Sequence, residues 1–335
     1  MSTLLKRKLG RSGIEVSAVG MGCWAIGGPW TFLGGQAGWS AVDDNESIRA
    51  IHSALDLGVT FFDTAANYGC GRSERVLGRA LSGRRDKAVI ATKFGYRVDE
   101  SAKIAMLYGD SEATSDVAPH VRESLEQSLR RLGTDHVDVF QLHVWPLEIP
   151  RALEVRRVLD DLVSEGSIRT YGWSTDRLDA VQAFSTSPAC GVVQQQLNVL
   201  DGNIDLLRWC ERENLASINR GPLGMGLLTG KFDASSTFPE DDVRKHAQWF
   251  PGFQNGKASR DWLESIDAVR AVLTSGGRTL GQGALAWIWA SSPVTVPIPG
   301  FKTVQQVEEN ARAMSFGPLT DAQVKEIDRL LRRRA

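Results

Sequence analysis

Three short β-branched runs end in side chains that can carry charge or move a proton. Asp63 ends the run VTFFD, Lys93 ends AVIATK and His143 ends VDVFQLH. Tyr68 follows Asp63 by five residues in DTAANYG. Each has a structural explanation of its own: a turn cap, a lysine reaching water, a satisfied core histidine or a packed ring. Polar groups are costly to bury within strands, but the carboxyl ends of parallel strands converge on one opening. The repetition therefore favours a single acid–base site.

These four side chains suit proton delivery to a carbonyl oxygen. A phenol has a pKa of about 10 and is a poor acid at neutral pH. A nearby ammonium lowers the pKa of the phenol, and a carboxylate keeps that ammonium charged and in place. An imidazole can hold the carbonyl oxygen by a hydrogen bond in a dry pocket. We therefore predict that Tyr68 is the proton donor and that Lys93, Asp63 and His143 assist it.

Other strand ends carry groups that suit a nicotinamide cofactor. Ser174 ends IRTYGWS and Gln194 lies in GVVQQQ, so both can hydrogen-bond a carboxamide. Gly300 ends VTVPIPG and allows the backbone to approach a phosphate, and Arg220 directly follows LASIN. The pattern predicts hydride transfer coupled to proton transfer.

The elements that must position these groups alternate between strand and helix. Amphipathic stretches such as ESIRAIHSALDLG and VRESLEQSLRRLG have apolar residues at helical spacing. Such alternation implies a parallel sheet, and eight units in 335 residues without a linker favour a closed barrel. We predict an α/β fold, a (β/α)8 TIM barrel, as a single domain over residues 1–335. The predicted strands lie around Ala18–Gly22 and at Val59–Asp63, Ala88–Lys93, Val137–His143, Ile168–Ser174, Gly191–Gln196, Leu215–Asn219 and Val294–Gly300.

Three segments depart from the repeating unit. LLKRKLGRSGIEVSAV predicts an N-terminal β-hairpin that turns at Gly10–Gly13 and caps the barrel floor. Phe94–Ala118 after the third strand and Leu223–Arg260 after the seventh are longer than ordinary connections. Loops after the strands border the active site of a barrel, so we expect pocket walls or a lid from the second loop. A mobile surface insertion is the alternative.

Composition limits the class of partner. The net charge of −1 offers nothing to nucleic acid or to an anionic membrane surface. Four scattered cysteines, no secretory signal and no run of 18 apolar residues favour a cytoplasmic protein. Five histidines without paired spacing argue against a metal site. The stretch GMGCWA fits a dinucleotide fingerprint, but the AIGGPWTFLGG region after it cannot start the required helix.

Seven motifs, in this order, resemble the aldo-keto reductase family over essentially the whole chain. FFDTAANYGCGRSERVLGRAL, ATKFG and DVFQLHVWP are similar to the segments that hold the family's catalytic tetrad. RTYGWSTD and VVQQQLNVL resemble the carboxamide-binding segments, and NRGPLGMGLLTGKF resembles the loop along the nicotinamide ring and pyrophosphate. VPIPGFKTVQQVEEN resembles the site for the adenosine 2′-phosphate and adenine. The chain looks most like the bacterial members and the branch related to potassium-channel β-subunits.

The resemblance implies a NADPH-dependent reductase of small aldehydes or ketones, with NADH as the alternative cofactor and the oligomeric state left open. The implied catalytic residues are Asp63, Tyr68, Lys93 and His143. The implied cofactor-binding residues are Cys23, Trp24, Asp63, Ser174, Thr175, Gln194, Arg220, Gly221, Pro222, Leu223, Gly224, Met225, Lys231, Arg244, Gly300, Lys302, Gln306, Glu309 and Asn310. An apolar or sugar-stacking substrate pocket is predicted from Trp24, Trp30, Trp145 and Trp249.

Three positions differ from the family pattern. Thr175 stands where an Asn is usual, and Arg220 stands where an aromatic ring often stacks on the nicotinamide. The Arg220 guanidinium can stack there or contact a phosphate instead. Gln306 stands where some members place an Arg on the 2′-phosphate, which leaves Lys302 as the evident positive charge in that motif.

Two rival functions fit the same barrel. A nicotinamide-binding regulatory protein with little turnover is the first, since channel subunits resemble these reductases. The tetrad histidine is replaced in those subunits, whereas His143 is present here, which favours an enzyme. A phosphate-binding isomerase is the second, and it would not need the carboxamide pair. No G-x-S-x-G motif of a nucleophilic hydrolase occurs.

Overall fold

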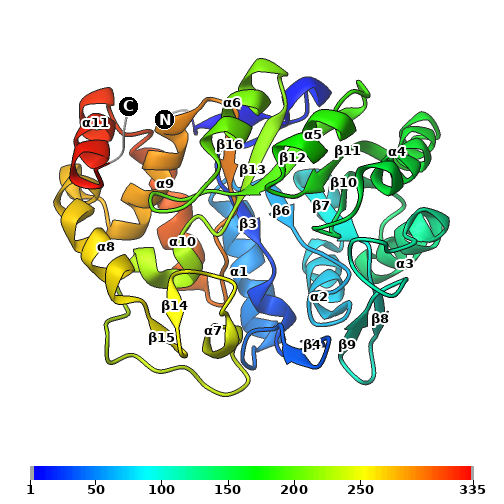
Figure 1. Cartoon of the computed structure of the whole chain (residues 1–335), viewed down its shortest axis with the longest axis horizontal. Helices are drawn as coiled ribbons and strands as arrows, with labels where there is room; N and C mark the ends of the chain where they lie inside the picture. Colours follow the sequence, from blue (N-terminus) through cyan, green and yellow to red (C-terminus); the bar gives the residue numbers. More distant parts are fainter. Residues whose placement is uncertain (1–3, 333–335) are drawn as a thin grey trace.

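The centre of the molecule is a closed parallel barrel. The computed structural model describes residues 4–332. Its main sheet has eight strands in the order β16-β13-β12-β11-β10-β7-β6-β3. A parallel bridge between Gly22 and Gly300 joins the two edge strands. The helices surround this sheet (Figure 1), which confirms the predicted (β/α)8 barrel of the α/β class.

All eight predicted strands are present, with ends that differ by a few residues. They are β3 (Gly20–Gly22), β6 (Phe61–Asp63), β7 (Val89–Phe94), β10 (Val137–Leu142), β11 (Ile168–Ser174), β12 (Cys190–Gln196), β13 (Ala216–Arg220) and β16 (Thr295–Pro297). The α-helices are α1 (Asp44–Asp56), α2 (Arg72–Leu81), α3 (Val121–Leu132), α4 (Ile149–Ser164), α5 (Leu178–Phe184), α6 (Ile204–Arg212), α7 (Val243–His246), α8 (Arg260–Leu273), α9 (Leu280–Ser291), α10 (Val304–Arg312) and α11 (Asp321–Leu330).

Capping residues explain where several helices begin and end. The Thr279 and Gln282 side chains form a reciprocal capping box at the start of α9. The Thr303 side chain accepts a hydrogen bond from the Gln306 backbone at the start of α10. Gly133 ends α3 with a φ of 65°, a left-handed conformation that glycine adopts at little cost. These caps fix the residues at which the three helices begin or end.

The barrel interior is apolar below and polar above. Phe61, Ala91, Val139 and Val192 belong to one buried cluster inside the barrel. Side chains two residues apart on a strand share a face. The next inward positions toward the mouth are therefore those of Asp63, Lys93, Gln141 and Gln194. The strand pattern therefore places a layer of polar groups above this buried apolar cluster, which we call the apolar plug.

The N-terminal hairpin supplies the floor of this plug, as predicted. Strand β1 (Lys6–Lys8) pairs with β2 (Glu15–Ser17), and Leu9, Ile14 and Val16 pack into the interior cluster. Gly10 has a φ of 52°, and a Cβ there would lie 2.4 Å from the Gly191 carbonyl oxygen. The turn therefore requires glycine at this close approach to the barrel.

The loops at the mouth contain strands that the sequence pattern did not predict. After β3 the chain forms β4 (Thr31–Phe32) and β5 (Gly35–Gln36), and after β7 it forms β8 (Arg97–Asp99) and β9 (Ile104–Met106). The four build a small sheet in the order β5-β4-β9-β8. Strands of two or three residues are too short to show alternation, and their pairing joins distant parts of the chain.

The long loop after β13 packs against the loop after β3. It contains the 3₁₀ segment η5 (Gly224–Thr229), α7 and the hairpin β14 (Phe253–Gln254) with β15 (Lys257–Ala258). The Val243 backbone donates to the Gly38 carbonyl over 2.9 Å, and the Gln36 side chain donates to the Asp241 carbonyl over 2.8 Å. Phe238, Phe250 and Phe253 are buried. The loop has its own apolar packing and borders the barrel mouth.

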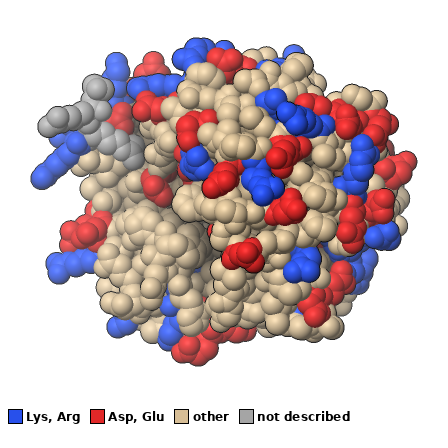
Figure 2. Space-filling view, turned by 45° about the vertical axis from the view of Figure 1, so that its right-hand side comes forward, with Lys and Arg blue, Asp and Glu red and all other residues tan. Residues whose placement is uncertain are grey.

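The surface carries mixed charge. On the face shown in Figure 2, Lys and Arg lie among Asp and Glu and do not gather into a large patch of one sign. Within residues 4–332, no helix has both the length and the apolar character needed to cross a membrane.

A buried ion pair connects the helix layer to the barrel and provides a test of the packing. Arg131 on α3 donates to Glu74 on α2 over 2.6 Å, and Thr92 on β7 donates to the other Glu74 oxygen over 2.6 Å. Glu74 is fully buried. Arg131→Met is expected to lower the free energy of unfolding by about 3–5 kcal/mol, because it leaves a buried carboxylate unpaired. Urea denaturation measures the change.

The double variant Glu74→Met/Arg131→Met is the control. It removes both charges, so it should recover most of the stability that the single variant loses. A double variant that is less stable than Arg131→Met would show that the ion pair is not the cause of the loss.

Candidate active site

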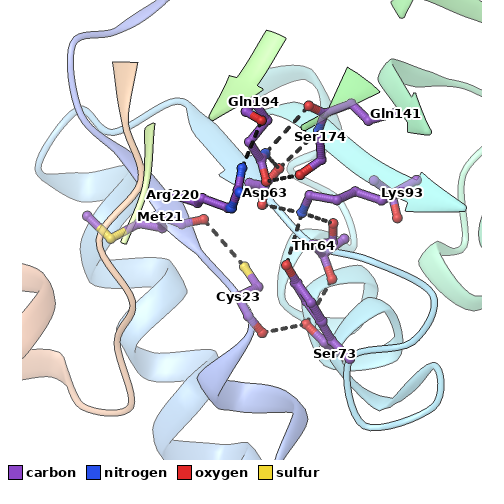
Figure 3. Close-up of polar contacts among 12 residues, drawn as sticks. Met21, Cys23, Asp63, Thr64, Ser73, Lys93, Gln141, Ser174, Gln194 and Arg220 are labelled. Carbon is purple, nitrogen blue, oxygen red and sulfur yellow. Dashed lines mark hydrogen bonds and ion pairs between the residues drawn. The ribbon is translucent and has the colours of Figure 1, made fainter. Parts of the chain in front are cut away.

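Lys93 is the centre of the acid–base group at the barrel mouth. Its ammonium lies 2.5 Å from Asp63 Oδ1, 2.9 Å from the Thr64 carbonyl oxygen and 3.2 Å from the Tyr68 hydroxyl. Figure 3 shows Lys93 between Asp63 and Thr64. The side chain is fully buried. The structure thus brings together Asp63, Tyr68 and Lys93 as the sequence predicted.

Strand register and a tight turn produce this arrangement. Lys93 pairs with Gln141, and Asp63 pairs with Ala91, two residues before Lys93. The side chains of Asp63, Lys93 and Gln141 therefore leave neighbouring strands within two residues of one register. The turn after β6 carries Tyr68 over them. Gly69 follows it with a φ of 60°, and a Cβ there would lie 2.0 Å from the Gly27 carbonyl oxygen. Glycine at this position allows the tyrosine turn to pack on the loop after β3.

The groups around Lys93 counteract the effect of burial on its pKa. Burial by itself would lower the pKa of Lys93, but Asp63 and Tyr68 outweigh that effect and raise the pKa. Lys93 is therefore a stable cation at neutral pH. Burial raises the pKa of Tyr68 above its ordinary value, whereas the positive charges of Lys93 and Arg220 act to lower it. Tyr68 therefore keeps its proton at neutral pH, and Lys93 stabilises the phenolate if the proton leaves.

His143 completes the group from the end of β10. Its ring lies edge-on to the Tyr68 ring, with 6.0 Å between the ring centroids, and it lines the cavity at the mouth. Its Nδ1 is buried without a hydrogen-bond partner among the described residues, so Nε2 is the nitrogen left to meet a ligand. Burial, together with the charges of Lys93 and Arg220, holds the pKa of His143 well below its usual range. The ring is neutral and can donate a hydrogen bond from Nε2.

The second oxygen of Asp63 is held by two amides. Gln194 Nε2 donates to Asp63 Oδ2 over 2.8 Å, and Gln141 Nε2 donates to the same oxygen over 3.2 Å (Figure 3). Ser174 Oγ donates to Gln194 Oε1 over 3.4 Å. Sequence reasoning missed Gln141. The signal was available, because Gln141 lies two residues after the inward-facing Val139 on β10 and two residues before His143.

A cavity of about 840 Å³ opens above these groups and contains most of the predicted cofactor residues. Those in its lining are Trp24, Asp63, Gln194, Arg220, Gly221, Pro222, Leu223, Met225, Lys231, Arg244, Gly300, Lys302, Gln306, Glu309 and Asn310. The lining formed by residues 4–332 does not include Cys23, Ser174, Thr175 or Gly224. Cys23, Ser174, Thr175 and Gly224 are buried, and their contacts with a cofactor stay predictions.

Three cations line one part of this cavity. The Lys302 ammonium donates to the Ser40 carbonyl and hydroxyl oxygens over 3.0 and 3.1 Å. Arg244 forms two hydrogen bonds of 2.8 Å with the buried carboxylate of Asp242. Burial lowers the pKa of both Lys302 and Lys231, and the charge of Arg244 adds to that effect. Mutual repulsion among cations in one cavity favours an anionic ligand.

Arg220 is held at the mouth by a carboxylate. It forms an ion pair with Asp176, and its Nη1 donates to the Gln194 carbonyl oxygen over 3.0 Å. Asp176 also accepts a hydrogen bond from the Gln196 backbone over 2.7 Å. The guanidinium is thus fixed at the end of β13, where its charge acts on both Tyr68 and His143.

Aromatic rings form the wall beside Tyr68. Of the four predicted tryptophans, Trp24, Trp30 and Trp249 line the cavity. The Trp24 ring is stacked on the Tyr68 ring with 6.1 Å between centroids. The prediction for Trp145 does not hold in this structure, because the turn after β10 leaves its side chain 51% exposed and outside the lining formed by residues 4–332.

The lining also contains residues that were not predicted, among them Phe32, Trp39 and Asn67. Phe32 and Trp39 come from the loop after β3, whose small sheet gave no sequence signal. Asn67 directly precedes Tyr68, so its nearness to the predicted proton donor could have been inferred.

Known proteins are similar to this chain in sequence and in fold. Residues 18–332 match the family model described as "Aldo/keto reductase family". The "Aldo-keto reductase yakc [NADP(+)]" of Schizosaccharomyces pombe is 31% identical over 328 residues, which cover 96% of this chain and 89% of that protein. The "NADH-specific methylglyoxal reductase" of Escherichia coli is 31% identical, with 95% of each chain covered. The solved structure of the glycerol dehydrogenase AKR11B4 from Gluconobacter oxydans superposes with a TM-score of 0.79 and 31% identity, covering 98% of this chain and 95% of that one.

The low pKa of His143 predicts how stability depends on pH. In the unfolded chain His143 takes up a proton as the pH falls through about 6.5, whereas the folded ring stays neutral. The unfolded state then binds more protons, so acidification from pH 7 to 5 costs stability. His143→Gln is expected to reduce that loss by about 1–2 kcal/mol. Urea unfolding of both proteins at the two pH values measures it.

Imidazole ¹⁵N chemical shifts provide a direct check on the same group. The His143 ring should keep the neutral pattern down to pH 5, with assignment from the spectrum of His143→Gln. A midpoint near the ordinary histidine value would contradict a neutral His143.

Proposed function

This chain belongs to the aldo/keto reductase family, and on that premise we propose that it reduces an aldehyde or ketone with NADPH, with Tyr68 supplying the proton. The observation that carries the proposal is the Lys93 ammonium, which contacts both Asp63 and the Tyr68 hydroxyl beneath the cavity. Burying three polar groups costs free energy. Packing alone therefore does not explain a buried lysine with these two partners. Such an arrangement suits tuning of a proton donor.

The cavity fits a nicotinamide dinucleotide in its chemistry. Bound NADPH would supply the hydride to the carbonyl carbon. Gln194 presents an amide to the cavity close to the acid–base group. Lys231, Arg244 and Lys302 suit phosphate groups, and Lys302 and Arg244 are held by hydrogen bonds to neighbouring residues. The loop after β13 contributes backbone: Met225 has a φ of 52° between two glycines that also have positive φ. Successive left-handed residues turn backbone N–H groups toward one side, as in anion-binding nests.

The roles of the catalytic residues follow from their contacts. Tyr68 is proposed to donate its proton to the carbonyl oxygen as that oxygen gains negative charge. Lys93 stabilises the resulting phenolate, and Asp63 holds the ammonium in position. His143 is proposed to donate a hydrogen bond from Nε2 to the same oxygen, because its neutral ring cannot act as the acid. In the reverse direction, the ionised Tyr68 accepts the proton of an alcohol.

NADPH is proposed over NADH because of the three cations in the cavity. The yeast relative is named for NADP(+), whereas the Escherichia coli relative of equal identity is named as NADH-specific. Family membership alone therefore does not decide between the cofactors. The Gln306 side chain already has a partner within the protein, because its Oε1 accepts a hydrogen bond from the Lys302 backbone over 2.7 Å. Discrimination between NADPH and NADH is proposed to depend on Lys302 together with Arg244 and Lys231.

The substrate is proposed to be a small carbonyl compound. Aromatic rings and Asn67 surround the space beside Tyr68, which suits a substrate with an apolar face and a polar group. Two relatives are named for three-carbon compounds, methylglyoxal and glycerol.

All four cysteines are free and buried. Unbridged thiols are typical of a reducing compartment, so the cytoplasm is the proposed location.

Tyr68→Phe tests the proton donor. It should lower kcat for carbonyl reduction by about 10²–10⁴, the usual effect of a positioned general acid, with little change in the Kd for NADPH. Steady-state kinetics and NADPH fluorescence measure the two quantities. Tyr108→Phe is the control, because its hydroxyl contacts Ser124 outside the cavity lining. Wild-type turnover by Tyr68→Phe would rule out this mechanism.

Lys302→Ala tests the cofactor. It should weaken NADPH binding by about 1–3 kcal/mol, the range for a charged hydrogen bond, and leave NADH binding nearly unchanged. Fluorescence titration with both cofactors measures this. Lys325→Ala on α11 removes a charge at an exposed position and serves as the control. Equal losses for the two cofactors would place Lys302 away from the 2′-phosphate.

A further inference from the structure

We infer that Gln141 is a positioning residue for proton transfer: it keeps Asp63 Oδ2 hydrogen-bonded when the cofactor draws Gln194 away. The inference rests on the proposed function, since it requires a nicotinamide carboxamide at Gln194. It adds a fifth side chain to the acid–base group, one that acts only through Asp63.

Gln141 has no access to a ligand. It is fully buried on β10, beside Lys93 in the parallel register and on the same face as His143. The cavity lining formed by residues 4–332 includes Asp63, Gln194 and His143 but not Gln141. Its amide donates to Asp63 Oδ2 over 3.2 Å, and its Oε1 lies 3.5 Å from Gln194 Nε2. Any effect on the reaction must therefore pass through these neighbours.

Two groups compete for the Gln194 amide: the Asp63 carboxylate and a ligand in the cavity. Gln194 Nε2 makes the shorter contact to Asp63 Oδ2, at 2.8 Å, yet the same side chain lines the cavity. A carboxamide bound there competes with Asp63 for the Gln194 amide. Because Lys93 occupies Oδ1, loss of Gln194 would leave Oδ2 with Gln141 as its donor. Leaving a buried carboxylate oxygen without a donor is costly, so Gln141 lowers the cost of cofactor binding.

The same contact screens the charge of Asp63. The negative charge of Asp63 acts to raise the pKa of Tyr68, against the effect of Lys93. An amide N–H that points at the carboxylate places positive partial charge beside it and weakens its field. Removal of this donor should therefore raise the pKa of Tyr68. A glutamate at the position, once it is ionised in the alkaline range where Tyr68 titrates, should raise the pKa of Tyr68 further.

A purely structural role makes a different prediction. Gln141 could fill the polar layer above the apolar plug without influencing the reaction. Its replacement would then lower the unfolding midpoint but leave the pH dependence of the reaction unchanged, and all ligands of the cavity would be affected equally.

The experiment uses Gln141→Met, which has similar length and no hydrogen bond, and Gln141→Glu, which is isosteric and acidic. Gln195→Met is the matched control, because Gln195 is an equally buried amide that donates to Ser217 outside the cavity lining. The first readout is the pH profile of alcohol oxidation. Its alkaline limb should move up by about half a unit or more for Gln141→Met and further for Gln141→Glu, with kcat about tenfold lower.

The second readout does not depend on turnover. The chain has four tyrosines, so ¹³Cζ-tyrosine NMR gives few signals, and Tyr68→Phe assigns the one from Tyr68. Its titration should shift in the same direction as the kinetic limb. Binding is measured with NADPH and with 2′,5′-ADP, which lacks the nicotinamide. Gln141→Met should weaken NADPH about tenfold and leave 2′,5′-ADP unchanged.

Each outcome decides the inference. Profiles of both Gln141 variants that overlay the wild type would overturn it, as would equal weakening of NADPH and 2′,5′-ADP. If Gln141→Met does not fold, the Gln141→Glu profile alone supports or overturns the role. A wild-type protein that neither binds NADPH nor reduces carbonyls would refute the proposed function instead, so the two failures can be told apart.

Discussion

The arrangement of this molecule depends on one buried ion pair, between Lys93 and Asp63 at the mouth of the barrel. Two charges removed from water are unstable unless their remaining hydrogen-bonding capacity is satisfied. Here the ammonium also contacts the Thr64 carbonyl and the Tyr68 hydroxyl, and the carboxylate receives two amide donors. The pair therefore requires partners from several strands, and only a closed sheet brings those strands together.

The barrel interior shows how this pair is tolerated. The hairpin floor and the lower inward residues form a dry apolar plug, with Phe61 and Val192 among them. Polar groups begin one inward position higher, where the cavity gives access to a ligand. The same alternation that buries Val139 aims Gln141 and His143 toward the mouth. Apolar packing below thus fixes the height and direction of the acid–base group above.

The cavity is completed by loops that are distant in sequence. The loop after β3 contributes Trp24, Trp30 and Trp39, and the loop after β13 contributes Arg244 and others. The two are joined by backbone hydrogen bonds such as that from Val243 to Gly38. Arg244 also lies over the Trp39 ring, with the guanidinium carbon 4.8 Å from its centroid. The same contacts join the aromatic wall near Tyr68 to the cations at the other part of the cavity.

The sequence by itself predicted the barrel and the nearness of Asp63, Tyr68, Lys93 and His143, because both depend on local patterns. Alternating strands and helices have their own periodicities, and a residue at a strand end is recognisable without knowing its neighbours. Asp63, Lys93 and His143 were found this way. The sequence did not determine the small sheet of β4, β5, β8 and β9, the outward direction of Trp145 or the contact of Gln141 with Asp63. Each depends on which distant segment lies opposite, and that is decided only when the tertiary fold closes the barrel and sets the register between strands.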